Sequence, residues 1–237
     1  MKKLLLVVVV ALMALPAQLS AKTKKKNKGV DTTLVSKLKT DDWSRTVKGA
    51  RKMDGMFPVY LNSKDGKLYF ELADSLMGRD YILANRVAQT SNTHDYVAGQ
   101  MVDRPQLVRF TRDSTKVMLH LVQKGNVVKE GDPIAASFKS NFTDPVLKGF
   151  KITAQRPGKV LIDVTSFFGS NEKSISPIKA DNPLSVIFGG SRSLKGSFQS
   201  DASGISVVKN FPRNIEIKTL LTFTLSNNDK PYSVLMH

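Results

Sequence analysis

The stretch IEIKTLLTFTL, residues 215–225, contains the longest alternation of apolar and polar residues in the chain. Side chains of a β-strand point to opposite faces in turn, so this period of two predicts a strand with one buried face. Such a strand needs neighbouring strands and a second layer against its apolar side. The predicted apolar face carries Ile215, Ile217, Leu221, Phe223 and Leu225, and the opposite face Glu216, Lys218, Thr222 and Thr224.

Three pairs of shorter runs have the pattern of antiparallel hairpins, in which a turn signal separates two runs of strand-forming residues. Together with the long strand they predict a mainly β fold of antiparallel sheets, sandwich-like or curved, with short N-terminal helices. The runs are FPVYLN and KLYFEL around Asp65-Gly66, QLVRF and KVMLHL around TRDST at 111–115, and FKITA and KVLIDV around Arg156-Pro157-Gly158.

The chain begins MKKLLLVVVVALMALPAQLSAKTKKK, with two lysines, a short apolar run and a plausible cleavage site after Ala21. This pattern predicts a signal peptide at residues 1–21 and a protein that is exported: periplasmic, outer-membrane-associated or secreted. The alternative is an uncleaved anchor, because Leu19 is larger than the residue a signal peptidase prefers at that position. After cleavage we expect no transmembrane segment, since no other run approaches the roughly 20 apolar residues that a spanning helix needs.

The formal net charge is +16, and five lysines lie between Lys22 and Lys28. A run of this kind is most often a solvated tail, and we expect a flexible basic lead at residues 22–30. Contact with an anionic surface through Lys22 to Lys28 is the sharper alternative. No aromatic residues are interleaved with these lysines, as a single-strand binding surface requires, and export also argues against nucleic acid as a partner.

The remaining chain divides at the polar segment QTSNTHD, residues 89–95. We expect a small α+β unit at 31–90 and a larger antiparallel β unit at 91–237. In the first unit Asp41 is positioned to cap a helical turn that carries Trp43 and ends near Gly49. The single tryptophan is expected to dock this turn on the strands that follow. Residues 169–203, rich in Gly, Ser, Asn and Pro, predict a long irregular connection.

No motif for catalysis or metal binding can be identified in the sequence. Cysteine is absent, which excludes thiolate chemistry and Cys-ligated zinc. His94, His120 and His237 have no spacing that would hold a metal, and we expect His120 to be half-exposed on the outward face of its strand. No nucleophile elbow or phosphate-binding loop is present. We therefore predict no catalytic residues, no metal ligands and no cofactor in this chain.

Residues 78–86 contain Gly78, Arg79, Asp80 and Arg86, which are the only candidate site residues. Gly78 permits an unusual backbone angle ahead of the strand at Tyr81, and Asp80 can accept backbone N–H groups at the bend. Arg79 or Arg86 could pair with a carboxylate across the sheet. A structural role for this group is the simpler interpretation, and contact with a ligand is the alternative.

Four stretches resemble a known family when they are taken together and in order. They are MDGMFPVYLNSKDGKLYFELADSLMGRDYILANRVAQTSN at 53–92, VAGQMVDRPQLVRF at 97–110, NFTDPVLKGFKITA with VLIDVTSFFGSNEKSISPI at 141–178, and SLKGSFQSDASGISVVKNFPRNIEIKTLLTFTL at 193–225. Over roughly residues 50–237 the chain resembles the N-terminal half of a bacterial family of exported zinc-dependent metalloproteases. In that family, two conserved regions of unassigned function precede a zincin-type peptidase domain.

The resemblance implies a role beside a peptidase domain, in cis or in trans, rather than catalysis. Members of the family are longer and carry a helical His-Glu-x-x-His zinc motif, which this chain lacks. Zinc is thus expected only in the missing peptidase domain. The ending KPYSVLMH fits a truncated gene, a fragment or a partner chain that is encoded separately. The alternative is a stand-alone exported binding module that holds a glycan or a protein partner through its basic surface or residues 169–203.

Overall fold

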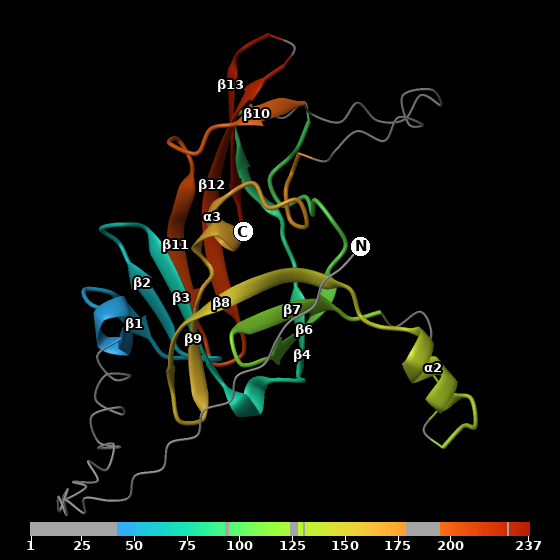
Figure 1. The fold of residues 1–237 in the computed structure, drawn as a ribbon. Coiled ribbons are helices and arrows are strands. Elements are labelled where there is room, and N and C mark those ends of the chain that lie inside the picture. Colours follow the sequence, from blue (N-terminus) through green and yellow to red (C-terminus); the bar gives the residue numbers. More distant parts are fainter. Residues whose placement is uncertain (1–41, 93–94, 124–127, 130, 179–194, 227) are drawn as a thin grey trace, which may run out of the picture.

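The computed structural model describes residues 42–92, 95–123, 128–129, 131–178, 195–226 and 228–237. The predicted signal peptide and basic lead lie outside these ranges. In the described part, the fold is mainly β and consists of two antiparallel sheets, one of them strongly curled, which confirms the predicted fold class (Figure 1).

Eight strands form the curled sheet in the order β1-β2-β3-β9-β8-β7-β6-β4. The hairpins β2/β3, β6/β7 and β8/β9 are the three predicted from their turns, and each is confirmed. The strands are β1 (Arg51–Met53), β2 (Val59–Asn62), β3 (Lys67–Ala73), β4 (Asp80–Leu83), β6 (Gln106–Arg112), β7 (Lys116–Leu121), β8 (Val146–Arg156) and β9 (Lys159–Asp163).

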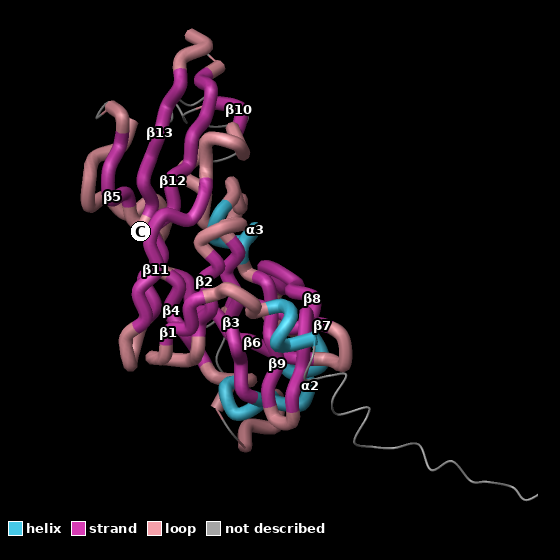
Figure 2. Tube along the Cα trace, turned by 90° about the vertical axis from the view of Figure 1, so that its left-hand side faces the viewer, coloured by secondary structure: helices cyan, strands magenta, loops and turns pink. Residues whose placement is uncertain are grey.

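The second sheet has the order β10-β12-β13-β5, and β11 pairs with the first half of β12. Its strands are β5 (Val87–Thr90), β10 (Gly196–Phe198), β11 (Gly204–Asn210), β12 (Ile215–Leu225) and β13 (Pro231–Met236). The run DYILANRVA at 80–88 is divided between the sheets, because β4 joins the curled sheet and β5 joins the second sheet. Figure 2 shows β12 and β13 extending beyond the curled sheet.

Strand β12 connects the two cores through a single face, as its alternation predicted. Ile215 and Ile217 pack against the core inside the curled sheet, and Leu221, Phe223 and Leu225 belong to a second core with Val87, Tyr232 and Val234. The opposite face is only partly polar and solvated. Thr222 is buried there because its hydroxyl donates to the carbonyl oxygen of Ala202 at 2.8 Å.

Among the described residues, helical structure is confined to short segments. The turn at 42–46 is helical, and Gly49 follows it with a positive φ of 77°, close to the predicted helix end. The others are η1 (Asp74–Leu76), α2 (Ala135–Asn141) and α3 (Thr165–Gly169). Of the predicted irregular connection at 169–203, residues 179–194 lie outside the described residues, and the described part contributes only the strand β10 and the last residue of α3.

The ranges 31–90 and 91–237 share both sheets in the described structure. In the curled sheet, β3 pairs with β9, and β4 pairs with β6 at one edge. In the second sheet, β5 pairs with β13. Each pair joins one range to the other, so the chain folds as an interleaved unit across residue 90 rather than as two units that each complete their own sheet.

Candidate functional site

Asp80 is the first residue of β4 and lies directly opposite Arg109 on β6. The Arg109 guanidinium donates to Asp80 Oδ1 from Nε at 2.8 Å and from Nη2 at 2.7 Å, and its Nη1 lies 3.6 Å from Asp144 Oδ2. All three side chains are about one-third exposed. Ion pairs at that exposure contribute at most about 1 kcal/mol, so this group mainly fixes the Arg109 side chain over the sheet.

The sequence suggested that Arg79 or Arg86 pairs with a carboxylate across the sheet, whereas the observed cross-sheet pair joins Asp80 to Arg109. In the described part of the chain, Arg109 forms the pair, and neither Arg79 nor Arg86 forms an ion pair. Both are exposed. The backbone of Arg86 exchanges two hydrogen bonds of 2.8 Å with His237, and Gly78 has the predicted unusual angle, with φ at 76°. The two arginines therefore flank β4 with their charged groups in solvent.

His120 lies beside the Arg109 group, half-exposed on the outward face, as predicted. Its Nε2 lies 2.8 Å from Thr111 Oγ1, and its Nδ1 lies 3.1 Å from the carbonyl oxygen of Asp144. An Nδ1–H that donates to this carbonyl leaves Nε2 to accept from the Thr111 hydroxyl. A hydroxyl bound to an imidazole can act as a nucleophile, but this pair lies outside both cavities described below. Here the contacts orient the imidazole ring.

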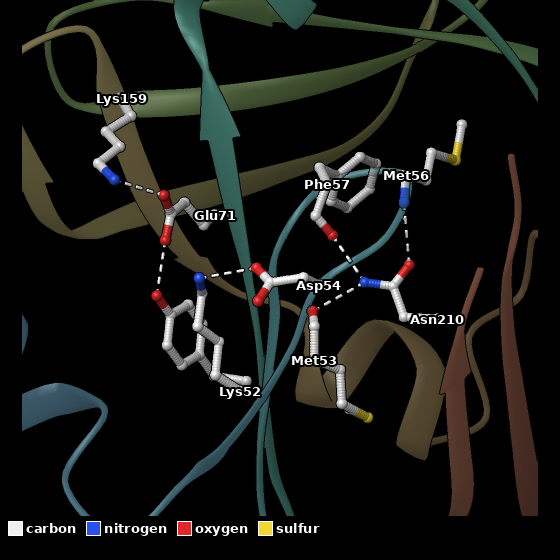
Figure 3. A network of polar contacts seen from close by, with 9 residues as sticks. Lys52, Met53, Asp54, Met56, Phe57, Glu71, Lys159 and Asn210 are labelled. Atoms are coloured by element: carbon white, nitrogen blue, oxygen red, sulfur yellow. Dashed lines mark hydrogen bonds and ion pairs between the residues drawn. The ribbon is translucent and has the colours of Figure 1, made fainter. Parts of the chain in front are cut away.

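A second polar group, which the sequence did not reveal, surrounds Glu71 on the outer face of β3. The Glu71 side chain is only 8% exposed, and it accepts hydrogen bonds from the Tyr60 hydroxyl and from Lys159 Nζ, each at 2.6 Å (Figure 3). Burial, followed by the hydrogen bond to Glu71, raises the pKa of Tyr60 to about 12. The buried carboxylate is thus satisfied by one neutral and one cationic donor, as a buried charge requires.

Trp43 covers this group and is 1% exposed. Its ring packs with Tyr60, Tyr69 and Leu161, and Arg156 Cζ lies 4.8 Å from the ring centroid. The docking role predicted for the tryptophan is therefore confirmed. It also explains why β3 is buried on both faces rather than on one.

The side chain of Asn210, at the end of β11, forms hydrogen bonds with the backbone of the segment between β1 and β2. Its Nδ2 donates to the carbonyl oxygens of Met53 at 2.9 Å and Phe57 at 2.8 Å, and its Oδ1 accepts from the Met56 amide at 3.2 Å (Figure 3). A Cβ on Gly55 would lie 2.3 Å from Asn210 Oδ1, so only glycine fits there without a shift. This contact joins residues more than 150 positions apart.

The larger of two shallow cavities has a volume of about 450 Å³ and lies beside α3. Lys67, Lys148 and Lys151 line it together with the hydroxyl-bearing residues Thr165 and Ser166. Two of these lysines are already paired, Lys67 with Asp163 at 3.2 Å and Lys148 with Glu172 at 2.8 Å. The cavity thus has little spare positive charge for an anionic ligand. The smaller cavity, of about 370 Å³, is lined by Asp42 and residues of β8.

Within the residues that the structure describes, no three histidine or acidic side chains come together in a way that could hold a metal ion. Over the same residues, none of the helices has the length and apolar character needed to cross a membrane. The predictions about cofactors, export and partners remain predictions.

Comparison with protein families gives two matches. Residues 99–237 match a family described as a domain of unknown function, DUF5117, and residues 43–90 match a second domain of unknown function, DUF5118. The first match covers more than half of the chain, so the chain belongs to the DUF5117 family. No curated protein and no solved structure matches the chain. Residues 91–98, between the two matches, coincide with the predicted division near residue 90. Both sheets contain strands from each side of this division.

Proposed function

We propose that this protein is a non-catalytic binding part of an exported zinc metalloprotease-like system. It packs against a peptidase domain, in cis or in trans, and shields it or presents substrate to it. The support from sequence is the resemblance over residues 50–237. Zinc and the residues that activate water belong, in this proposal, to the peptidase domain.

The observation that carries the proposal is the contrast between polar groups and exposed apolar groups. The buried or half-buried polar side chains around Glu71, Asn210 and Arg109 are used for internal contacts. By contrast, large apolar side chains are left in solvent: Ile82 is 75% exposed, Ile134 60% and Val146 51%. Ile82 and Val146 belong to strands of the curled sheet, and Ile134 directly precedes α2. In this proposal, these side chains are points of contact with the peptidase domain.

Association with the peptidase is the first test. The DNA around the codon for His237 should contain, in frame or in a neighbouring gene, a peptidase with a His-Glu-x-x-His motif. That peptidase, with its glutamate changed to glutamine to prevent autolysis, is produced together with this chain and isolated through a tag on the peptidase. We expect the two to co-purify at equal stoichiometry. Absence of such a gene, or of association, contradicts the proposal.

The alternative, a stand-alone binding module, makes a different prediction. It requires a stop codon followed by an unrelated gene, and retention on a polyanion column that falls steeply as salt is raised. The formal charge of +16 is the observation that favours it.

A further inference from the structure

Strand β4 is the terminal strand of the curled sheet, with β6 as its neighbour in the sheet. A terminal strand presents backbone amide and carbonyl groups on its open side, where another chain can pair with it. Proteins commonly protect such edges with proline, a bulge or an exposed lysine. The sequence of β4, Asp80-Tyr81-Ile82-Leu83, contains no proline or lysine, and its register with β6 is unbroken.

The register determines which residue of β4 faces the open side. Val122 donates its amide to the carbonyl oxygen of Leu107 at 2.8 Å, so Leu107 directs its backbone groups toward β7. Residues alternate along a strand, and Val108 therefore directs its groups toward β4, where it lies opposite Tyr81. Ile82, the next residue, turns its amide and carbonyl away from β6 and toward the open edge.

The side chain of Ile82 adds an apolar contact at the same point. It is 75% exposed and lies opposite Leu107, which is half-buried on the outward face. An added strand would place a side chain beside Ile82 while it pairs with the backbone of Ile82, and Leu107 lies one strand further away. An edge strand thus offers backbone pairing for affinity and a side-chain contact for selectivity.

Two cations flank β4 in the sequence. Arg79 directly precedes β4, Arg86 follows it by three residues, and both are exposed without an ion pair among the described residues. A second copy of the chain would bring the same two arginines and the same strongly positive net charge, so like charges oppose pairing between copies. A segment with carboxylates near its ends is complementary to both arginines.

We propose that the open edge of β4 binds an extended polypeptide segment of another protein, with an apolar residue beside Ile82 and carboxylates near Arg79 and Arg86. The segment adds a strand to the curled sheet. This inference rests on the proposed function and deepens it, since it assigns the presented ligand a class: an extended, acidic-ended peptide rather than a folded surface or a glycan.

The probe is a fluorescent nine-residue peptide with a central isoleucine, alternating valine and threonine around it, and glutamate at each end. Binding to the purified protein is measured by fluorescence anisotropy at low salt. A peptide with lysine ends, and one with proline at the centre, serve as controls. We expect saturable binding of the glutamate-ended peptide and at least about tenfold weaker binding of both controls.

Three variants locate the site. Ile82→Pro removes the edge-facing amide and leaves the bonds to β6 intact, because a proline is tolerated where the N–H faces solvent. It should weaken binding at least about tenfold. Arg79→Glu with Arg86→Glu should weaken binding by about tenfold at low salt and less at high salt. Val207→Lys, which replaces an exposed apolar side chain on β11 in the second sheet, is the matched control and should leave binding unchanged.

Thermal unfolding verifies that each variant is folded. If Ile82→Pro unfolds, Ile82→Lys replaces it, since it keeps the backbone and removes the apolar contact. No saturable binding at peptide concentrations up to about 1 mM would overturn the inference. Equal weakening by Val207→Lys would also overturn it, and so would concentration-dependent dimerisation that Ile82→Pro abolishes in the absence of peptide binding. Peptide binding without association with the peptidase would instead overturn the proposed function and leave the edge site in place.

Discussion

The contact between Gly55 and Asn210 provides the sharpest test of how the two matched family regions are joined. Gly55→Ala would place a methyl group 2.3 Å from Asn210 Oδ1 and 2.8 Å from the carbonyl oxygen of Phe211. Both distances are far below van der Waals contact, so the Asn210 side chain must leave its position. It then loses two donated hydrogen bonds and one accepted bond.

The expected loss follows from those three bonds. Each contributes about 1 kcal/mol net, so Gly55→Ala should lower the free energy of unfolding by about 2–4 kcal/mol. With a urea m-value of about 1–3 kcal/mol/M, the midpoint should fall by about 1–2 M. Unfolding is followed by the fluorescence of Trp43 and by far-UV circular dichroism, whose transitions should coincide because the regions share both sheets.

Two further variants make this prediction refutable. Gly149→Ala is the matched control, since a Cβ there has no atom within 4 Å and its φ is not positive; it should change stability by less than about 0.5 kcal/mol. Asn210→Ala should cost about as much as Gly55→Ala, and the double variant little more than either alone, because both remove the same bonds. Full additivity, or a Gly55→Ala protein as stable as Gly149→Ala, would refute the reasoning.

The remaining predictions concern the outer face around Glu71. Lys159→Met leaves the buried carboxylate without its cation and should destabilise by about 3 kcal/mol in urea unfolding, and adding Glu71→Gln should recover part of that loss. If the double variant is no more stable than Lys159→Met, the charge argument is wrong. Trp43→Ala should cost about 3 kcal/mol, because the indole is 1% exposed; an unchanged urea midpoint, followed by circular dichroism, would contradict this. Tyr60 has its pKa raised from about 10 in the unfolded chain to about 12, so the folded protein keeps a proton that the unfolded chain loses, and stability falls as pH rises through that window. Between pH 9 and about pH 12, the free energy of unfolding should fall less in Tyr60→Phe than in wild type, by up to about 2–3 kcal/mol. An equal fall in both proteins would disprove the assignment.

Local pattern was sufficient to predict the strands and hairpins but not their order in the sheets. The alternation in β12 correctly identified the face that carries Ile215 and Phe223, and turn residues such as Gly158 located three hairpins. The residues that determine a hairpin are close together in the sequence, so a short stretch of sequence is enough to predict it. The placement of β4 at the far edge from β3 depends on long-range packing, which no local period encodes.

The candidate site was predicted in part for the same reason. Asp80, Arg79 and Arg86 were selected as candidates because they lie close to Gly78 in the sequence. The partner of Asp80 is Arg109, 29 positions away, and only the β4–β6 register brings them together. Glu71 lies on the face of β3 opposite the core residues Leu68, Phe70 and Leu72. The covering tryptophan, 28 positions earlier, converts that face into a buried one.

The rate of peptide hydrolysis is the most direct test of the proposal that this chain is non-catalytic and acts on a separate peptidase domain. The peptidase that carries the His-Glu-x-x-His motif is assayed on casein with and without an equimolar amount of this chain, and the chain is also assayed alone with zinc. We expect the chain to change kcat/KM of the peptidase and to hydrolyse nothing by itself. Chelator-sensitive hydrolysis by the chain alone, or a peptidase whose kcat/KM is the same in its presence and absence, would contradict the account.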